Sequence, residues 1–496
     1  MKVESSPARC TMRRVVSTSL SDSRTESRPA SRFAGKRVHF IGIGGSGMSG
    51  LARVLLDSGA IVTGSEPRGN EQTRLLAERG VHISDQQLGR FLSREVDLVV
   101  RTAAVPDSNV EFQIATKMGL RTVKYAQLLG EVMSERLGVA VSGTHGKSTT
   151  TAMIAHALLS TGKDPSFVIG GTVPQLGGGS RSGGSNLFVA EACEYDRSFH
   201  NLAPTVAVIT NIDADHLDCY RDIDDIIESF RDFAALVPDD GKGRIIAAAE
   251  DRVAQALSIF DPSMIEWCAL ETPATWTVQS GGVENGCHTG RVLHDGKPVA
   301  ELKLRVAGRH NLSNACLAIA ACHACGLPAA EAAAAIGTFL GVDRRMTEIG
   351  RTPAGAIVVD DYGHHPTEVR ATLEALRERY QPARLIAVFQ PHQASRTRLL
   401  MDEFAVSFGE ADLVTLPEIY FVRDSDEDRR SISSAQLVRR LVENGVDARF
   451  LPTFDRVVEF LSAESRAGDL IVTMGAGNVW EIGRDLVADS GMRIAG

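Results

Sequence analysis

Two glycine-rich turns, each set between an apolar run and a helical pattern, constrain the fold of this chain most strongly. The run Val38-His39-Phe40-Ile41 precedes the turn Gly42 to Gly47, and Met48 to Ser58 follows with helical spacing. The run Gly138 to Ser142 precedes a second turn, Gly143 to Thr149, in the same order. A strand, a tight turn and a helix in succession form the repeating unit of α/β sheets. The sequence therefore predicts an α/β fold with a glycine turn at the end of two of its strands.

The length of 496 residues predicts several domains, because one hydrophobic core rarely serves so long a chain. Further elements are expected as strands at 61–63, 97–100, 187–190, 206–210, 357–359, 385–389 and 470–473 and as alanine-rich helices between 311 and 340. We predict three α/β domains in series, at 35–130, 131–342 and 343–496. The Ser- and Arg-rich residues 1–34 predict a disordered tail, with a transit peptide or an overcalled start site as alternatives.

Composition excludes several classes of function. The net charge of −9 argues against nucleic acid binding, which needs clustered Lys and Arg. Eight scattered cysteines without a secretory signal predict reduced thiols and a cytoplasmic location. Cys322 and Cys325 form a lone C-x-x-C in an alanine-rich helical pattern and are interpreted as buried small side chains. Residues 311–330 lack acidic residues, Lys and Arg, but other polar residues interrupt them, so no membrane insertion is expected.

The first glycine turn satisfies the pattern G-x-G-x-x-G between a strand and a helix, the context in which it binds phosphate. Its glycines let the backbone approach a diphosphate at the positive end of the helix. Glu66, just past the next predicted strand, can receive a ribose hydroxyl. The residues expected at the ligand are Gly42, Gly44, Gly45, Ser46, Gly47 and Glu66. Taken alone, the turn favours a nicotinamide-dependent dehydrogenase, and a tight turn without a ligand is the alternative.

The second turn resembles a P-loop but fails the strict pattern, because Val141 stands where glycine is expected. The chemistry survives this departure. Backbone N–H groups from Thr144 to Ser148 can face phosphate oxygens, Lys147 can neutralise β- and γ-phosphate charge, and Ser148 can reach a magnesium ion. An incidental Gly-Lys-Ser at a helix start is the alternative. A dehydrogenase would leave this second turn unused.

Several motifs, in order along nearly the whole chain after residue 35, resemble those of the Mur ligase family. They are Gly143 to Thr150, Glu191-Ala192, Thr210 to His216, Gly308 to Ala315 and Asp360 to Glu368. Gly42 to Gly50 and the string Gly363-His364-His365-Pro366 look like the alanine-adding branch of the family. The resemblance implies ATP-dependent ligation of L-alanine to the lactyl carboxylate of UDP-N-acetylmuramate. The reaction would pass through an acyl phosphate, release ADP and phosphate, and serve peptidoglycan precursor synthesis.

The resemblance also implies a role for each domain and for particular residues. The domains would be, in order, a Rossmann-like UDP-binding domain, a P-loop-like ATPase domain and a Rossmann-like amino-acid-binding domain. Lys147, Glu191 and His216 would be catalytic, and Ser148, Glu191 and His216 would bind Mg²⁺. The ATP site would comprise Gly143, Thr144, His145, Gly146, Lys147, Ser148, Thr149, His310, Asn311, Asn314, Arg344 and Asp360. His365 and Arg396 would contact the amino acid, whose carboxylate calls for a charge-assisted donor.

Residue chemistry supports some of these roles and leaves alternatives for others. Glu191 follows a buried apolar strand, where an unpaired carboxylate would be costly, so it needs a cation or another polar partner. His216 could instead be a satisfied loop histidine. Asn311 could be a helix cap, and Arg344 beside Arg345 could be a solvated charge pair.

The chain also departs from the family pattern. The family commonly reads Pro-His-Arg-Tyr-Ser-Arg where this chain has Pro391-His392-Gln393-Ala394-Ser395-Arg396, so Gln393 removes one expected guanidinium. Asn478 stands where the family usually has aspartate. Several sister ligases carry a carbamoylated lysine after the aspartate-histidine motif, but no lysine lies between His216 and Gly241. The metal shell must therefore be completed without that carbamate.

The competing functions are a ligase that joins a preformed tripeptide to the same sugar nucleotide, the dehydrogenase above, and a catalytically silent nucleotide-binding relative. Product mass separates the two ligases, and absorbance at the reduced-cofactor band tests the dehydrogenase. Binding of ATP without phosphate release would indicate the silent relative. Small-molecule substrates and a monomer or weak dimer are expected.

Overall fold

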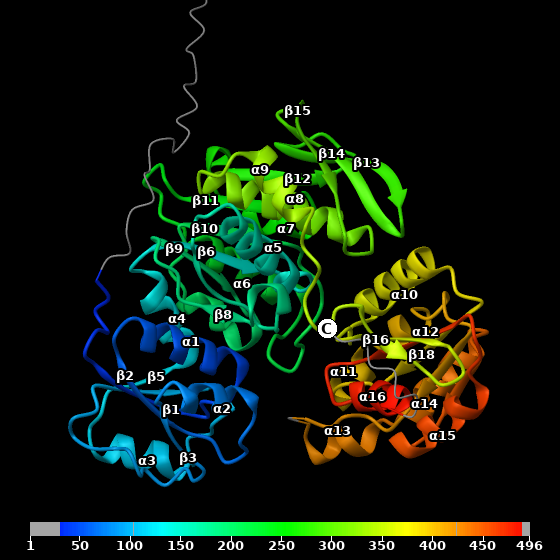
Figure 1. The fold of residues 1–496 in the computed structure, drawn as a ribbon, viewed down its shortest axis with the longest axis horizontal. Helices are drawn as coiled ribbons and strands as arrows, with labels where there is room; N and C mark the ends of the chain where they lie inside the picture. The colour runs from blue at the N-terminus through cyan, green and yellow to red at the C-terminus, as the bar shows by residue number, and fades with distance from the viewer. Residues whose placement is uncertain (1–29, 103, 423, 489–496) are drawn as a thin grey trace, which may run out of the picture.

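The computed structural model describes residues 30–102, 104–422 and 424–488 and folds them into three α/β units, each built on its own sheet (Figure 1). The predicted α/β fold with three sheets in series is therefore confirmed. Residues 1–29 of the predicted tail lie outside the described residues.

The N-terminal unit is a parallel five-stranded sheet in the order β3-β2-β1-β4-β5. Its elements are β1 (Arg37–Ile41), α1 (Ser46–Asp57), β2 (Ile61–Ser65), α2 (Glu71–Glu78), β3 (His82–Ser84), β4 (Leu98–Arg101), α3 (Val110–Lys117), β5 (Thr122–Lys124) and α4 (Tyr125–Met133). The predicted strand at 38–41 and helix at 48–58 correspond to β1 and α1. Because β1 lies between β2 and β4, the first glycine turn opens where the strand order reverses, the usual place for a ligand.

The central unit has a ten-stranded sheet in the order β15-β14-β13-β12-β11-β10-β6-β9-β7-β8. Its first half comprises β6 (Leu137–Ser142), α5 (Lys147–Ser160), β7 (Ser166–Val168), η1 (Pro174–Leu176), β8 (Ser180–Arg181), β9 (Leu187–Glu191), η2 (Tyr195–Asn201), β10 (Val206–Ile209) and α6 (Ile223–Ala234). Its second half comprises β11 (Arg244–Ala248), α7 (Asp251–Leu257), η3 (Pro262–Met264), β12 (Ile265–Leu270), β13 (Trp276–Glu284), β14 (Cys287–His294), β15 (Lys297–Lys303), α8 (His310–Ala324) and α9 (Ala329–Ile336).

The end of the central sheet differs from the expectation. No strand was expected between residue 210 and the helices at 311–340, whereas the structure places β11 to β15 there. Most residues of the antiparallel strands β13 and β15 are exposed, so their apolar signal is weak. Cys322 and Cys325 are buried free thiols, as predicted. Among the described residues, no helix combines the length and the apolar character needed to cross a lipid bilayer.

The C-terminal unit is a six-stranded sheet in the order β16-β17-β21-β18-β19-β20, parallel except for β16. Its elements are β16 (Thr347–Arg351), β17 (Ile357–Asp361), α10 (Pro366–Tyr380), β18 (Arg384–Phe389), α11 (Ala394–Leu399), α12 (Met401–Ala405), β19 (Leu413–Leu416), α13 (Asp426–Ser431), α14 (Ser434–Glu443), β20 (Ala448–Phe450), α15 (Phe454–Glu464), β21 (Asp469–Met474) and α16 (Trp480–Ala488). The predicted strands at 357–359, 385–389 and 470–473 correspond to β17, β18 and β21.

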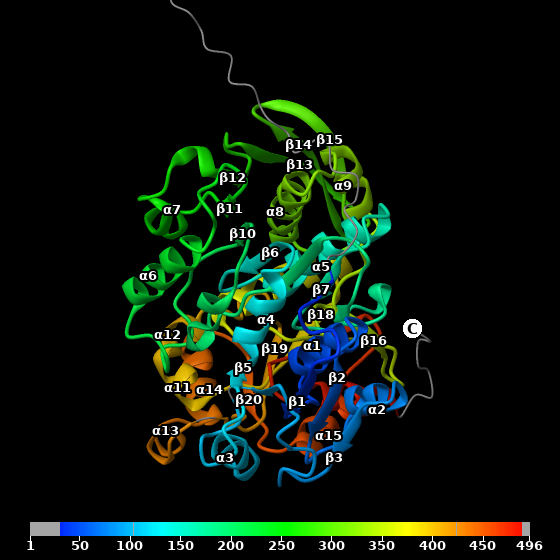
Figure 2. The same ribbon diagram turned by 90° about the vertical axis from the view of Figure 1, so that its left-hand side faces the viewer.

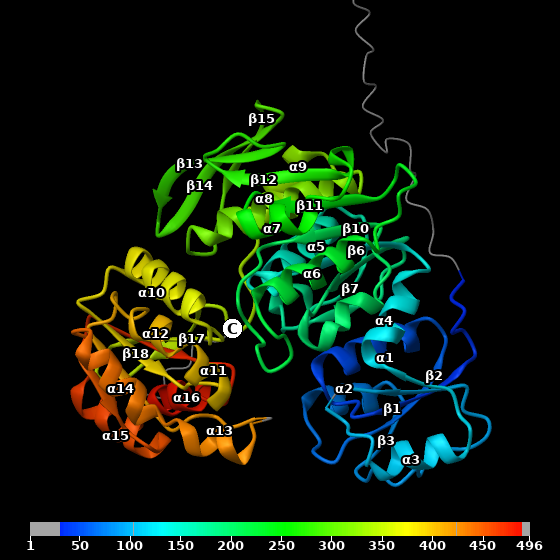
Figure 3. The same cartoon turned by 180° about the vertical axis from the view of Figure 1, so that it is seen from behind.

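The central unit contacts the other two units at different sides (Figure 3). At the N-terminal joint, α1 packs on β7 and β8, and α4 packs on η2 (Figure 2). One apolar cluster runs through this joint, from Phe33 to Ile265. At the C-terminal joint, the loop Asp213 to His216 meets the start of α10 and Arg396. The turn between β13 and β14 also reaches α10, where His288 Nε2 lies 2.9 Å from Glu378 Oε2.

Candidate active site

The second glycine turn joins β6 to α5 and is held by the loop that follows β10. Gly143 and Gly146 have φ of 139° and 82°, and a side chain at Gly143 would collide with Thr210 Oγ1 at 1.9 Å. Glycine is therefore required there both by conformation and by space. Thr210 Oγ1 donates a hydrogen bond to the His145 carbonyl at 2.5 Å, and Asn211 Nδ2 donates to the same oxygen at 3.0 Å.

The same loop uses two of the amides that sequence analysis assigned to phosphate. The Thr144 N–H donates to the Asn211 carbonyl at 3.2 Å, and the His145 N–H donates to Asn211 Oδ1 at 2.8 Å. The expectation that the whole run from Thr144 to Ser148 offers free amides is therefore wrong for these two. The first-turn amides of α5 lack acceptors within the helix and point toward its N-terminal end, where an anion is favoured.

Lys147 occupies the mouth of the turn and has a partner that sequence analysis missed. Its ammonium donates to the carbonyls of Gly143 at 2.6 Å and Thr144 at 3.1 Å, and to Glu194 Oε1 at 2.9 Å. Glu194 Oε1 also lies 3.6 Å from His216 Nε2. Burial alone would raise the pKa of Glu194, but Lys147 and His216 hold it below its usual value. A second acid three residues after Glu191 was the available signal for Glu194.

Ser148 and Glu191 meet at the end of β9. The Ser148 hydroxyl donates to Glu191 Oε2 at 2.8 Å, and the Gly170 N–H donates to the same oxygen at 2.9 Å. The predicted metal ligands Ser148 and Glu191 are thus brought together. The third, His216, lies in the loop after β10 with φ of 53° and packs edge-on against Tyr195, with ring centroids 5.2 Å apart.

A cavity of about 700 Å³ opens between the second glycine turn and the C-terminal unit. The predicted ATP-site residues that line it are His145, Gly146, Ser148, Thr149, His310, Asn311 and Asn314. Arg344 and Asp360 instead pair with each other, with Arg344 Nε 2.9 Å from Asp360 Oδ2. Their neighbours Arg345 and Asp361 line the cavity. Adjacent residues on a strand or a tight turn face different ways, and the sequence alone does not tell which one faces the ligand.

The start of α8 forms one wall of this cavity. The N-cap of α8 is Arg309, so Asn311 lies inside the first turn and is not the cap considered as its alternative role. Asn311 Nδ2 donates to the Ala307 carbonyl at 2.6 Å, and Asn314 Nδ2 donates to Asn311 Oδ1 at 2.9 Å. Burial lowers the pKa of His310 to about 4, so this imidazole is neutral near pH 7. The wall therefore offers amide and imidazole groups without charge.

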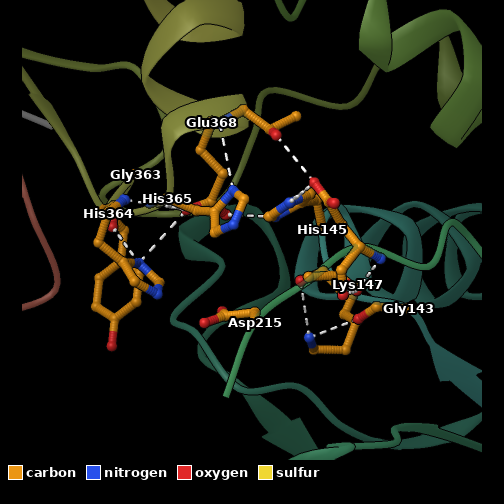
Figure 4. Close-up of polar contacts among 12 residues, drawn as sticks. Gly143, His145, Lys147, Asp215, Gly363, His364, His365 and Glu368 are labelled. Carbon is orange, nitrogen blue, oxygen red and sulfur yellow. Dashed lines mark hydrogen bonds and ion pairs between the residues drawn. The ribbon is translucent and has the colours of Figure 1, made fainter. Parts of the chain in front are cut away.

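Residues of the C-terminal joint, among them Thr367 and Glu368, line the other side of the cavity. Figure 4 shows His145 beside His365 and Glu368. Thr367 Oγ1 donates to Asp213 Oδ2 at 2.9 Å, and His145 Nδ1 lies 3.4 Å from Glu368 Oε1. The rings of His145 and His365 lie 4.7 Å apart. Burial would lower the pKa of His145, but the Asp213 and Glu368 carboxylates raise it to about 9. A protonated His145 on the glycine turn thus faces carboxylates from both units.

The two residues predicted at the amino acid, His365 and Arg396, both contact the loop after β10. His365 Nε2 lies 3.1 Å from the Ala214 carbonyl, and Arg396 Nε donates to Asp215 Oδ1 at 2.9 Å. Gln393, which replaces an expected arginine, is buried at the start of α11 with φ of 71°, and its Nε2 donates to the Val422 carbonyl at 3.3 Å. Gln393 therefore serves a loop contact and adds no charge.

The first glycine turn, predicted to bind a diphosphate, makes most of its amide hydrogen bonds within the N-terminal unit. The amides of Gly42 and Ile43 donate to the Ser65 carbonyl at 2.9 and 3.2 Å. Glu66 Oε2 accepts from the Gly44 amide at 3.1 Å, so in this structure it braces the turn. A side chain at Gly47 would lie 2.8 Å from the Tyr125 hydroxyl. Gly45 is the N-cap of α1, and Ser46 begins the helix.

Three family models match the chain in succession. Residues 37–137 match the Mur ligase family, catalytic domain; residues 141–322 match the Mur ligase middle domain; and residues 344–477 match the Mur ligase, glutamate ligase domain. These matches follow the three sheets, so the same division is found by sequence and by structure.

Curated relatives and solved structures agree with this family. UDP-N-acetylmuramate--L-alanine ligase of Caldanaerobacter subterraneus is 39% identical, and that of Acetivibrio thermocellus is 42% identical. Each alignment spans 92% of this chain and 98% or 97% of the relative. The solved UDP-N-acetylmuramate-alanine ligase of Thermotoga maritima is 27% identical, with a TM-score of 0.76 over 91% of this chain and 98% of that one. The murein peptide ligase of Psychrobacter arcticus is 26% identical, with a TM-score of 0.69 over 93% and 100% of the two chains.

The order of the motifs, the three sheets, the glycine turn with Lys147 and the matched models all point the same way. The chain belongs to the Mur ligase family.

Proposed function

We propose that this protein uses ATP to join L-alanine to the lactyl carboxylate of UDP-N-acetylmuramate, a step of peptidoglycan precursor synthesis. Relatives that carry the name of this ligase align over nearly their whole length at about 40% identity. The observation that carries the proposal is the cavity of about 700 Å³, whose walls combine the second glycine turn with residues of the C-terminal unit. The second glycine turn, expected to bind phosphate, and the C-terminal unit, expected to hold the amino acid, therefore border one site.

The first step activates a carboxylate, which by itself repels a nucleophile and has no good leaving group. An oxygen of the lactyl carboxylate attacks the γ-phosphorus of ATP, the bond to the β-phosphate oxygen breaks, and ADP leaves with that electron pair. The products are an acyl phosphate and ADP. The Lys147 ammonium, which Glu194 keeps charged and aimed at the turn, stabilises the negative charge on the transferred group.

Mg²⁺ fits the donors at the end of β9. The Ser148 hydroxyl and the Glu191 carboxylate lie within 2.8 Å of each other, and both are hard oxygen ligands of the kind that Mg²⁺ prefers. Glu194 contacts both Lys147 and His216, and with His216 it would extend this donor set. When bound, the ion supplies positive charge at the phosphate oxygens. The Ser148–Glu191 hydrogen bond holds this carboxylate in place without a carbamoylated lysine.

The second step forms the amide. The neutral amine of L-alanine attacks the acyl carbon, the tetrahedral intermediate collapses, and phosphate leaves while the amine loses a proton. His365 and Arg396 lie on the C-terminal unit beside the Asp213 to His216 loop, where they can orient the amine substrate. Burial lowers the pKa of His364 to about 4 and also lowers that of His365, so neither imidazole repels an ammonium group near pH 7.

The sugar nucleotide would lie with its diphosphate on the first glycine turn. This placement accounts for a dinucleotide-like pattern in a ligase, because the α1 N-terminus with Gly42, Gly44 and Gly47 favours any diphosphate. Small-molecule substrates, ATP dependence and the free thiols of the described residues favour work in the cytoplasm, as a monomer or weak dimer.

A second candidate is ligation of a tripeptide to the same sugar nucleotide, favoured by the likeness to the Psychrobacter arcticus murein peptide ligase. It ranks lower because the relatives near 40% identity carry the alanine ligase name.

The test is ADP release by the purified full-length protein with ATP, Mg²⁺ and UDP-N-acetylmuramate, adding L-alanine, glycine, L-serine or a tripeptide separately. Product masses are recorded in each case. We expect turnover that requires the sugar nucleotide and is fastest with L-alanine. Fastest turnover with the tripeptide would favour the second candidate, and no turnover with any acceptor would overturn both.

A further inference from the structure

The Arg396 guanidinium is held on two sides by protein groups. Its side chain is only 5% exposed, and its Nε donates to Asp215 Oδ1 at 2.9 Å across the C-terminal joint. Its Nη1 lies 3.2 Å from both the carbonyl and Nδ1 of His392. Nη2 makes no hydrogen bond to any of the residues that the structure describes. Nε and Nη1 are thus anchored, and Nη2 is left for a further acceptor.

Asp215 links this guanidinium to the loop that carries His216. Its side chain is 7% exposed, and Oδ1 accepts both from Arg396 and from the His216 amide, the latter at 2.7 Å. Its other oxygen lies 3.8 Å from His216 Nε2. The buried Asp215 carboxylate is thus held between the Arg396 guanidinium and the backbone of the loop after β10.

The surroundings of Arg396 include a small cavity at the C-terminal joint. A small cavity of about 10 Å³ lies between the Asp215 loop and α11, and among the described residues that line it, Arg396 is the single arginine. Gln393 lines the same cavity but directs its amide to Val422. Recognition of a carboxylate by Arg396 depends on how its guanidinium is oriented, because guanidinium donors bind well only in the right plane.

We propose that Asp215 is a positioning residue for the incoming amino acid: it anchors Arg396 across the C-terminal joint so that Nη2 of the guanidinium donates to the amino-acid carboxylate. The proposal rests on the proposed function, since the acceptor is taken to be L-alanine. The proposal makes different predictions for the two chemical steps. Formation of the acyl phosphate does not use Arg396, whereas capture of that intermediate by the amino acid depends on the Asp215–Arg396 pair.

The experiment compares both steps in the full-length protein and its Asp215→Asn variant. Hydroxylamine, added in place of L-alanine, attacks the acyl phosphate and releases phosphate, so hydroxamate formation reports the first step alone. The second step is measured as the KM for L-alanine at saturating ATP and sugar nucleotide. In Asp215→Asn we expect the KM for L-alanine to rise at least about tenfold, because a buried charged partner is lost. Hydroxamate formation and the KM for ATP should stay within about twofold of the unchanged protein.

Two further variants separate positioning from a general structural role. Asp215→Glu keeps the charge and should recover part of the affinity for L-alanine. Asp469→Asn removes a comparably buried acid that pairs with Arg384 at 2.7 Å, remote from the cavity, and should leave the KM for L-alanine unchanged even if it lowers stability. An unchanged KM in Asp215→Asn would overturn the proposal. So would equal losses of hydroxamate formation and of alanine capture, or an Asp215→Glu variant as poor as Asp215→Asn.

Failure of the proposed function would look different. If the unchanged protein formed no hydroxamate with ATP and UDP-N-acetylmuramate, the ligase assignment itself would fall. If it formed hydroxamate but the KM for L-alanine did not respond to Asp215, only the positioning role would fall.

Discussion

The two joints of the central unit are built from opposite kinds of contact. At the N-terminal joint, a single apolar cluster that contains Leu51, Leu129 and Phe199 continues from one unit into the other. At the C-terminal joint, none of the apolar clusters of the described residues spans both units. The contacts there are a buried ion pair, side-chain hydrogen bonds and a histidine facing two carboxylates.

This difference in contacts predicts which unit is held less firmly to the central unit. Apolar burial is strong and non-directional, so the N-terminal and central units should behave as one body. Breaking a polar contact between two units costs little free energy, because water replaces the lost partner. We therefore expect the C-terminal unit to separate from the central unit more readily than the N-terminal unit does.

The largest effect on turnover is expected at Lys147 in the second glycine turn, which lies between the two joints. Lys147→Met should lower ADP release by roughly 100-fold or more, because charge on the transferred phosphate loses its ammonium partner. Lys297→Met, on the exposed start of β15, is the matched control and should leave turnover unchanged. Steady-state ADP release measures both, and near-normal turnover in Lys147→Met would remove this residue from the chemistry.

The next largest effect is expected from overpacking the apolar N-terminal joint. A methyl group at Gly130 of α4 would lie 1.8 Å from the Asn201 carbonyl oxygen of η2. Gly130→Ala should therefore lower the free energy of unfolding by about 3 kcal/mol, as overpacking forces the two elements apart. Urea unfolding followed by circular dichroism measures the loss. Gly409→Ala, which meets nothing within 4 Å, is the control, and equal stabilities of the two variants would contradict a rigid N-terminal joint.

The stabilisation that the polar C-terminal joint provides should depend on pH. The pKa of His145 is raised from 6.5 to about 9, against the effect of burial, by Asp213 and Glu368. Its stabilisation is therefore complete below pH 6.5 and is lost as pH rises through about 9. We expect the unchanged protein to lose on the order of 2 kcal/mol across this window relative to His145→Gln. Unfolding free energies of both proteins across this range test this, and parallel pH profiles would refute it.

The smallest effect concerns a single hydrogen bond of the C-terminal joint. Thr367→Val removes the donor to Asp213 Oδ2, worth about 1 kcal/mol. The variant should populate the open arrangement more, which small-angle X-ray scattering detects as a larger radius of gyration. Thr116→Val, whose hydroxyl bonds within its own helix α3, should leave the radius unchanged. A variant at Thr367 with the same radius would show that this hydrogen bond does not hold the joint closed.

Local sequence patterns predicted the strands and helices around the candidate site. They did not predict the half of the central sheet that contains β11 to β15. The runs at 38–41 and 138–142 became β1 and β6, because an apolar strand followed by a glycine turn is recognisable within about ten residues. Strands β13, β14 and β15 were not predicted, since β13 and β15 are mostly exposed and the three strands pair mainly with each other. The stated roles of Ser148 and Glu191 stay predictions, although the two side chains do meet.

The sequence by itself determined the α/β class, the two glycine turns and the family, because each depends on residues that are neighbours in the chain. Only the tertiary structure decided which side chains face one another. Glu194 reaches Lys147 from 47 residues away, and Asp215 reaches Arg396 from 181 residues away. Arg345 and Asp361, rather than Arg344 and Asp360, line the cavity. Such contacts depend on how separate sheets pack and which way a strand residue points, and no local pattern encodes either.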